Sequence, residues 1–303
     1  MPTIDINEFA NIKCTTTLRG VAILIIIIGH VGVSGFDCRY FNPFGGIGVA
    51  MFLFLSGYGL SESYNKNGLT KFWKKKILRI ALPYLIWIPI YHITINLSPL
   101  GSLQYKEFIP RYWFIEYLII LYVGFYFIFL YIKNYSLIVI VLIGVFSFCC
   151  LPNLQSEQSF SFVCGIAFSH YKPQLCKLDK CKLLQVASLC FIIGTMALLI
   201  KQLPQLRYYG LDSMPIKVAN LFIKLPIGLS LILLLVYLLP QGNKTLIKMG
   251  NISYELYLVH VPFFMPIAGK IMNLIIFAIQ SFLLAYLLHV LTKIAITKNR
   301  NHG

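Results

Sequence analysis

The sequence predicts an all-α membrane protein, a single-domain bundle of about ten transmembrane helices with both termini in the cytoplasm. Of its 303 residues, 58% are hydrophobic and 12% are charged, whereas soluble domains average roughly 45–50% apolar and 25% charged residues. Apolar runs long enough to cross a hydrocarbon core of about 30 Å recur along the chain. The net charge of +16 falls in short clusters between these runs. It forms no basic stripe of the kind that binds nucleic acid, so no nucleic-acid partner is expected.

Each apolar run is expected to cross the lipid bilayer once. In chain order the expected spans are 18–36, 46–60, 80–97, 112–131, 136–151, 160–170, 183–200, 216–239, 252–268 and 271–294. The first resembles a signal peptide, but the GVSGF that follows is a poor cleavage site, so we expect it to be retained. The sixth is the weakest and is expected to be short or tilted. Pro262 and Pro266 predict a kink in the ninth.

The distribution of basic residues orients this predicted bundle. With a cytoplasmic N-terminus, the inner segments hold 18 of the 26 Lys and Arg residues, six of them in the stretch 66–79. The positive-inside rule therefore predicts that both termini are cytoplasmic and that the number of crossings is even. The expected location is the inner (cytoplasmic) membrane of the cell.

The first span carries two ionisable residues, Arg19 and His30. Their separation of 11 residues is within about 20° of a whole number of helical turns, so both lie on one face, about 16 Å apart along the axis. Ionisable residues at membrane depth are costly, which makes both candidates for function. A purely structural interpretation stays open, in which Arg19 reaches the membrane surface and His30 bonds a neighbouring backbone group.

Arg, ten residues and His in the first span resemble the signature of the acyltransferase 3 family. Four later segments resemble the patterns of that family in the same order: GGIGVAMFLFLSGYGL (45–60), KKKILRIALPY (74–84), RYWFIEYLIILY (111–122) and GNISYELYLVHVP (250–262). The resemblance covers essentially the whole chain. The sequence shows no match to the extracellular esterase-like domain that is fused to some members, so we expect the membrane part alone to complete the transfer, as in the short, fucose-acetylase-like members. Three positions depart from the pattern: Tyr58 replaces a Phe, Lys76 replaces the first Arg of a basic box, and Glu255 replaces a small residue.

The resemblance implies transfer of an acyl group, acetyl by expectation, from cytoplasmic acetyl-CoA to a hydroxyl of a cell-surface glycan or lipid-linked sugar. His30 would act as general base or as a transient acyl carrier. Lys76 and Arg79, at i and i+3, would bind the phosphates of the donor, although Lys lacks the bidentate fork of Arg. Arg19 would guide the pantetheine arm. The alternative for the basic box is simple anchoring at the cytoplasmic surface.

Four residues are weaker candidates for binding the acceptor: Trp113 and Glu116 in the fourth span, and Tyr257 and His260 in the ninth. Trp113 is equally typical of a membrane-interface anchor, and His260 of a structural residue beside Pro262. No pattern supports a role for the remaining histidines, His92, His170, His289 and His302. The eight cysteines form no CxxC pair and no Cys/His metal spacing, so no metal is expected.

A transporter or flippase of a glycan intermediate is the alternative function, because its spans also carry rare charges and prolines. Such proteins show matching features in their two halves, whereas here Arg19, His30 and the basic box all lie in the first third of the chain. The asymmetry favours an enzyme. A non-catalytic anchor for a glycan-assembly complex also stays open.

Overall fold

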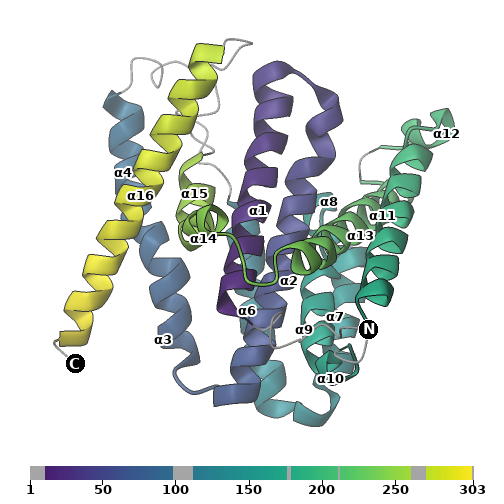
Figure 1. The fold of residues 1–303 in the computed structure, drawn as a ribbon, viewed down its shortest axis with the longest axis horizontal. Helices are drawn as coiled ribbons and strands as arrows, with labels where there is room; N and C mark the ends of the chain where they lie inside the picture. The colour runs from purple at the N-terminus through teal and green to yellow at the C-terminus, as the bar shows by residue number, and fades with distance from the viewer. Residues whose placement is uncertain (1–10, 98–111, 176–178, 211, 261–270, 302–303) are drawn as a thin grey trace.

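The computed structural model describes residues 11–97, 112–175, 179–210, 212–260 and 271–301. Every regular element within these ranges is helical, which confirms the predicted all-α class (Figure 1). The α-helices are α1 (Ile12–His30), α2 (Asn42–Asn67), α3 (Phe72–Lys76), α4 (Leu82–Leu97), α6 (Trp113–Tyr131), α7 (Ser136–Cys150), α8 (Asn153–Ser156), α9 (Ser161–His170), α10 (Lys172–Leu175), α11 (Lys180–Lys201), α12 (Pro204–Arg207), α13 (Met214–Leu238), α14 (Lys244–Asn251), α15 (Ser253–His260) and α16 (Ile271–Asn301). Short 3-10 or π-helical pieces are η1 (Val31–Gly35), η2 (Arg39–Phe41), η3 (Ile77–Ala81) and η4 (Lys133–Tyr135).

Within the described ranges, seven helical stretches are long and apolar enough to cross a membrane. They are Ile12–Val33, Arg39–Asn67, Phe72–Ile93, Trp113–Tyr131, Lys180–Lys201, Met214–Leu238 and Leu274–Lys298. The other expected spans correspond to the shorter helices α7, α9 and α15. With 10 residues, α9 measures about 15 Å, half a hydrocarbon core. Pro262 and Pro266 lie outside the described residues, and ten crossings with cytoplasmic termini remain a prediction.

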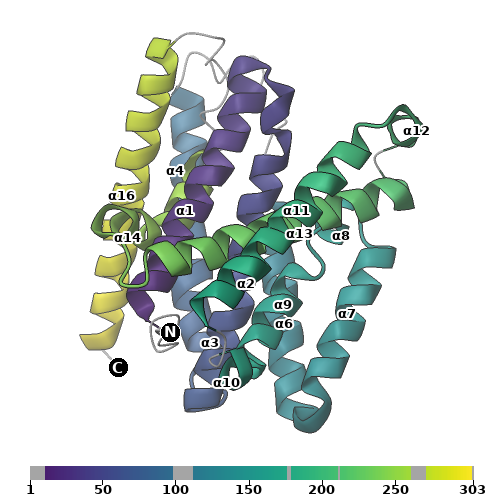
Figure 2. The ribbon, with the colours of Figure 1, turned by 45° about the vertical axis from the view of Figure 1, so that its right-hand side comes forward.

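Helices α1 and α2 form the centre of the bundle and run side by side in both ribbon views (Figures 1 and 2). Glycines allow their backbones to approach closely. A Cβ at Gly29 would lie 2.5 Å from the backbone N of Gly45, and one at Gly48 would lie 2.6 Å from the carbonyl O of Ala22. Small residues at such crossings are typical of helix packing in membranes. The crossing fixes the face of α1 that carries Arg19 and His30.

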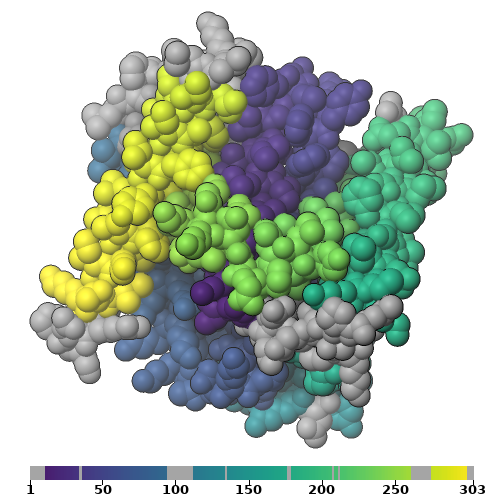
Figure 3. Space-filling view, viewed as in Figure 1, coloured from purple at the N-terminus to yellow at the C-terminus, as the bar shows by residue number. Residues whose placement is uncertain are grey.

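Other helices flank this central pair. Helices α4 and α16 lie on one side, and α11 with α13 on the other (Figures 1 and 2). Helix α14 lies across the middle of the face seen in the space-filling view, between α16 and α11 (Figure 3). Large apolar side chains are exposed on the flanking helices, among them Leu189 and Leu199 of α11 and Leu283 of α16. An outer surface of this kind suits contact with lipid.

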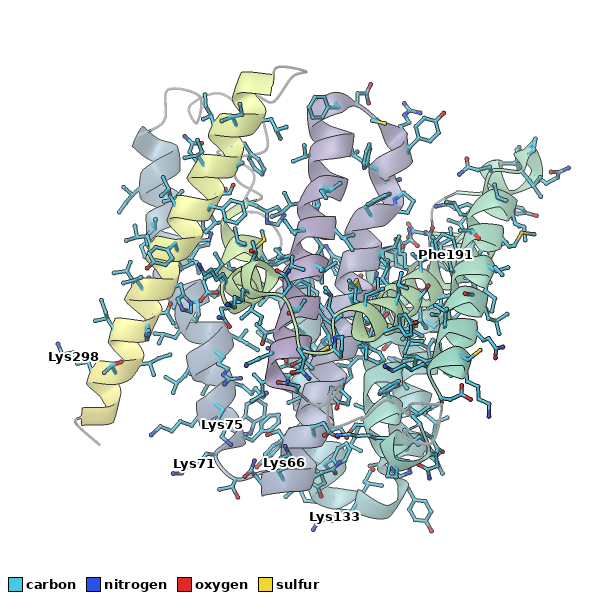
Figure 4. The ribbon with its side chains drawn as sticks, viewed as in Figure 1. Lys66, Lys71, Lys75, Lys133, Phe191 and Lys298 are labelled. Carbon is cyan, nitrogen blue, oxygen red and sulfur yellow. The ribbon has the colours of Figure 1, made fainter. Side chains whose placement is uncertain are left out.

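The two ends of the bundle differ in charge. Five lysines labelled in Figure 4 gather in its lower part: Lys66, Lys71, Lys75, Lys133 and Lys298. All of them belong to segments that the sequence predicts to be cytoplasmic. Because they come from three separate parts of the chain, the fold itself brings the predicted inner segments to one end.

Candidate functional site

His30 is the last residue of α1, and its side chain is exposed. Its ring centroid lies 5.4 Å from that of His260 in α15. A Cβ at Gly45 would lie 3.9 Å from Nε2 of His30, so the glycine leaves space on that side of the imidazole. An exposed imidazole with only a glycine on this side is one that a substrate can reach.

His260 is completely buried. Its Nδ1 lies 2.9 Å from the carbonyl oxygens of both Leu256 and Tyr257. Because carbonyl oxygens only accept hydrogen bonds, Nδ1 carries a proton and donates it, which fixes both tautomer and ring orientation. The ring of Tyr257 lies 5.7 Å from that of His260. Of the four candidate acceptor-binding residues, His260 therefore lies beside His30, and Tyr257 packs against His260.

Three cationic side chains meet further along α1 in the direction of its N-terminus. Arg19, Lys76 and Arg79 interact electrostatically with one another, and the two arginines interact with Tyr122 of α6. The Nζ of Lys76 lies 5.0 Å from the centroid of the Tyr122 ring, as in a cation–π interaction. Nη2 of Arg19 lies 3.8 Å from the Cβ position of Gly59, which leaves room for the guanidinium. The predicted donor-binding residues are thus brought together around Tyr122, and we call these four residues the Tyr122 group.

The helix that carries Lys76 and Arg79 is irregular. Helix α3 ends at Lys76 and is followed directly by the π-helical η3. In a regular α-helix, Lys76 and Arg79 would share one face as residues i and i+3. That expectation is wrong here, because a π-helical turn holds more residues than an α-helical turn. Lys76 is half-buried and Arg79 is exposed, yet both still interact with Arg19.

Comparison with known proteins identifies the family. A family model described as an acyltransferase domain, that of the acyltransferase 3 family, matches residues 14–297. The chain belongs to the acyltransferase 3 family. It is therefore a membrane O-acyltransferase that uses an acyl donor, as the resemblance predicted. No curated protein and no solved structure matches the chain.

Trp113 and Glu116 of this acyltransferase lie at the start of α6 and differ in exposure. Trp113 is half-buried and packs against the main hydrophobic core. Glu116 is exposed, whereas its neighbours Ile115 and Tyr117 are buried. The structure does not bring Glu116 to His30, and its predicted role in acceptor binding remains a prediction.

Several polar contacts near the site of the acyltransferase escaped the sequence analysis. The hydroxyl of Tyr254 donates to the carbonyl of Ile80 in η3 at 2.9 Å. His289 of α16, for which the sequence shows no pattern, lies 2.9 Å from Glu255, the residue that departs from the family pattern. The sequence signal for this pair was one ionisable residue in each of two apolar runs. The two residues are 34 positions apart, so no local spacing predicted their contact. Within the described ranges, no group of three His, Cys, Asp or Glu side chains could hold a metal ion.

Proposed function

We propose that this acyltransferase moves an acetyl group from cytoplasmic acetyl-CoA to a hydroxyl of a cell-surface glycan or lipid-linked sugar, in the cytoplasmic membrane. One observation carries the proposal. Arg19, the member of the Tyr122 group that lies on α1, shares this helix with His30; Arg19 lies in its first half and His30 at its end. The distance between Arg19 and His30 along the axis is about 16 Å. Coenzyme A has the matching form, with phosphates at one end of a long arm and a thioester at the other.

The donor would bind with its phosphates at the Tyr122 group. Arg and Lys form charge-assisted hydrogen bonds with phosphate oxygens, and these are stronger than bonds between neutral groups. Lys76 and Arg79 come from the lysine-rich part of the chain that also contains Lys71 and Lys75, which gather at one end of the bundle (Figure 4). This end would face the cytoplasm, where coenzyme A is found. Arg19, half-buried between the two ends, would hold the start of the pantetheine arm.

The chemistry would take place at His30. As a general base, its unprotonated nitrogen accepts the proton of the sugar hydroxyl while the hydroxyl oxygen attacks the thioester carbonyl carbon. The carbon–sulfur bond then breaks, and the coenzyme A thiolate receives the proton from the imidazolium. As an acyl carrier, His30 itself attacks the carbonyl carbon, releases the thiolate, and passes the acetyl group to the hydroxyl in a second step. Both routes need an imidazole in a fixed position, and the packing of His260 against His30 supports this.

The acceptor would approach His30 from the side of α15. Tyr257 supports this because its ring packs against that of His260 and lies 5.0 Å from that of Phe114 at the start of α6. Trp113 adjoins Phe114 and would form part of the same wall. Glu116 is exposed, so it would contact the acceptor only if the first turn of α6 rotated when the acceptor binds.

The deciding experiment is acetyl transfer from radiolabelled acetyl-CoA by membranes that contain the protein and its native acceptor. Wild type is compared with His30→Ala at matched expression. We expect the variant to lose at least about 100-fold in rate, the lower range for loss of a general base or nucleophile. The control is His92→Ala, an exposed histidine far along the chain from this site, which should transfer normally.

Equal transfer by wild type and His30→Ala would remove His30 from the mechanism. Absence of transfer by wild type in the presence of the native acceptor would exclude acetyl-CoA as the donor. Transfer lost in both His30→Ala and His92→Ala would point to a general effect of histidine replacement on folding.

A further inference from the structure

A second group of charged residues lies where α11, α13 and the segment 151–158 meet. Lys217, Asn220 and Lys224 follow one another on α13 at spacings of three and four, so they share one face of the helix. Lys217 and Asn220 are buried, and the Lys224 side chain is 12% exposed. Lys201, the last residue of α11, is half-buried and reaches the same face. We call Lys201, Lys217 and Lys224 the lysine cluster.

Each lysine of the cluster has a polar partner among the described residues. The Nζ of Lys224 forms an ion pair with Glu157, whose side chain is 2% exposed. The Nζ of Lys217 donates to the carbonyl of Leu151 at 2.9 Å, and the Nζ of Lys201 donates to Oδ1 of Asn220 at 2.6 Å. Lys201 also interacts electrostatically with Lys224 and Glu157.

The charges of this group do not balance. The ammonium groups of Lys201 and Lys224 share one carboxylate, that of Glu157, and Lys217 adds a third positive charge on the same face of α13. Among the described residues the ion pairs include no second acid for them. Charge that is held away from water without a counterion is costly, and ionisable residues at membrane depth mark ligand sites for that reason. The amide oxygen of Asn220 and the carbonyl of Leu151 stabilise Lys201 and Lys217 but do not neutralise their charge. A bound anion from outside the protein would neutralise it.

The lysine cluster is a close neighbour of His30 through two consecutive glycines. The Cβ position of Gly45 lies 3.9 Å from Nε2 of His30, and that of Gly46 lies 2.9 Å from Nζ of Lys224. Because adjacent Cα atoms are about 3.8 Å apart, the two nitrogens are no more than about 14 Å apart. Nε2 of Gln158, next to Glu157, donates to the carbonyl of Gly46 at 2.9 Å and holds this arrangement.

The cluster lies away from the lysine-rich end of the bundle. Helix α11 rises from α10 at the lower end to α12 at the upper right (Figure 1), so Lys201 at its end lies opposite Lys66 and Lys133 (Figure 4). The Tyr122 group and the lysine cluster are therefore two separate cationic sites.

We propose that the lysine cluster binds a negatively charged group on the acceptor, a phosphate or carboxylate attached to the sugar that receives the acetyl group. This inference rests on the proposed function and narrows its acceptor to anionic sugars. A separation of no more than about 14 Å between Lys224 and His30 allows one sugar to bind lysine through its charged group while a hydroxyl reaches the imidazole. Lysine binds phosphate as a compact point charge, and carboxylate in the same way.

The test is binding of three radiolabelled sugars to the purified protein in lipid nanodiscs: glucose 1-phosphate, glucuronate and glucose. All titrations contain saturating coenzyme A, so that the Tyr122 group is occupied. Wild type should bind at least one charged sugar about tenfold or more tightly than glucose, the effect of one charge-assisted contact. A preference for glucose 1-phosphate identifies phosphate as the recognised group, and a preference for glucuronate identifies carboxylate.

The informative variant is Lys201→Gln/Lys217→Gln, which removes the excess charge but keeps a hydrogen-bond donor at each position and leaves the Lys224–Glu157 pair intact. It should lose the preference, while Lys201→Arg/Lys217→Arg should keep it. Equal affinity of wild type for all three sugars, or an unchanged preference in the Gln variant, overturns the proposal. If the double Gln variant aggregates, Lys201→Gln alone decides by the same criteria. A parallel titration of wild type with acetyl-CoA separates the proposed donor site from the proposed acceptor site. If wild type does not bind acetyl-CoA, the donor site is contradicted and the acceptor site is not.

Discussion

A single hydroxyl, that of Tyr112, connects three segments next to the site. It accepts a hydrogen bond from Nε1 of Trp87 in α4 and donates one to the carbonyl of Leu258 in α15, both at 2.9 Å. Leu258 lies two residues before His260. Through these two hydrogen bonds the Tyr112 hydroxyl helps to hold α15, and with it His260, in position beside His30. The Tyr112 side chain is itself buried.

Tyr112→Phe should destabilise the protein and slow transfer. The change leaves a buried N–H of Trp87 and the Leu258 carbonyl without this partner, at a cost of about 1–3 kcal/mol. Thermal unfolding in detergent, followed by tryptophan fluorescence, measures the loss. Tyr131→Phe is the matched control, because Tyr131 is 75% exposed and should be replaceable without effect. Equal unfolding temperatures for the two variants would contradict a structural role for the Tyr112 hydroxyl.

Lys76→Ala/Arg79→Ala should weaken acetyl-CoA binding by at least about tenfold, since two charge-assisted contacts to phosphate are lost. Equilibrium dialysis with labelled acetyl-CoA measures it. The control replaces two lysines at the same end of the bundle, Lys133→Ala/Lys298→Ala (Figure 4). If both double variants bind donor normally and insert correctly, the basic box serves only as an anchor.

At the scale of elements, glycines decide which helices can touch. A Cβ at Gly57 of α2 would contact the carbonyl O of Phe162 in α9 and lie 3.1 Å from its carbonyl carbon. Gly165 of α9 makes the reciprocal approach to Phe54 of α2. Because both obstacles are backbone atoms, neither helix can yield by turning a side chain. Gly57 and Gly165 therefore serve close packing between α2 and α9.

Gly57→Ala should lower stability by about 1–3 kcal/mol, the usual cost of adding a methyl group to a filled interface. Gly124→Ala is the matched control, since no atom lies within 4 Å of a Cβ at that position of α6. Alanine should be neutral there, or stabilising by up to about 1 kcal/mol, because it favours helix over glycine. Thermal unfolding of both variants in the same detergent tests this. A Gly57→Ala protein as stable as wild type would mean that α2 and α9 can move apart freely.

At the scale of the whole molecule, the distribution of charge predicts how the bundle sits in the membrane. The lysine-rich end in Figure 4 should face the cytoplasm. The opposite end carries exposed tyrosines that lie in connections between helices, Tyr40 at 90% and Tyr208 at 91% exposure. With this orientation the donor end of the site faces the cytoplasm and the lysine cluster lies toward the outer surface.

Single cysteines in a cysteine-free background test the orientation. In sealed right-side-out vesicles, Tyr40→Cys and Tyr208→Cys should react with a membrane-impermeant maleimide, and Lys66→Cys and Lys133→Cys should react only after the vesicles are opened. Reaction of all four from outside would contradict the membrane topology. The reverse pattern would place the Tyr122 group on the outer side and exclude cytoplasmic acetyl-CoA as its ligand.

The sequence by itself determined the class of the protein and one face of one helix. Composition and run length predict membrane helices because lipid imposes apolarity residue by residue, and the regular turn of an α-helix places Arg19 and His30 on one side of α1. Both inferences need only local information.

Only the tertiary structure decided what lies opposite that face. The position of Tyr122 beneath Lys76, the approach of His260 to His30, and the convergence of Lys201 and Lys224 on Glu157 each join helices far apart in the chain. Such contacts depend on which helices pack together and where glycine lets their backbones approach, and no local pattern encodes that choice. The π-helical turn after Lys76 is a smaller example, because residue spacing assumes the regular helix that the packed structure interrupts.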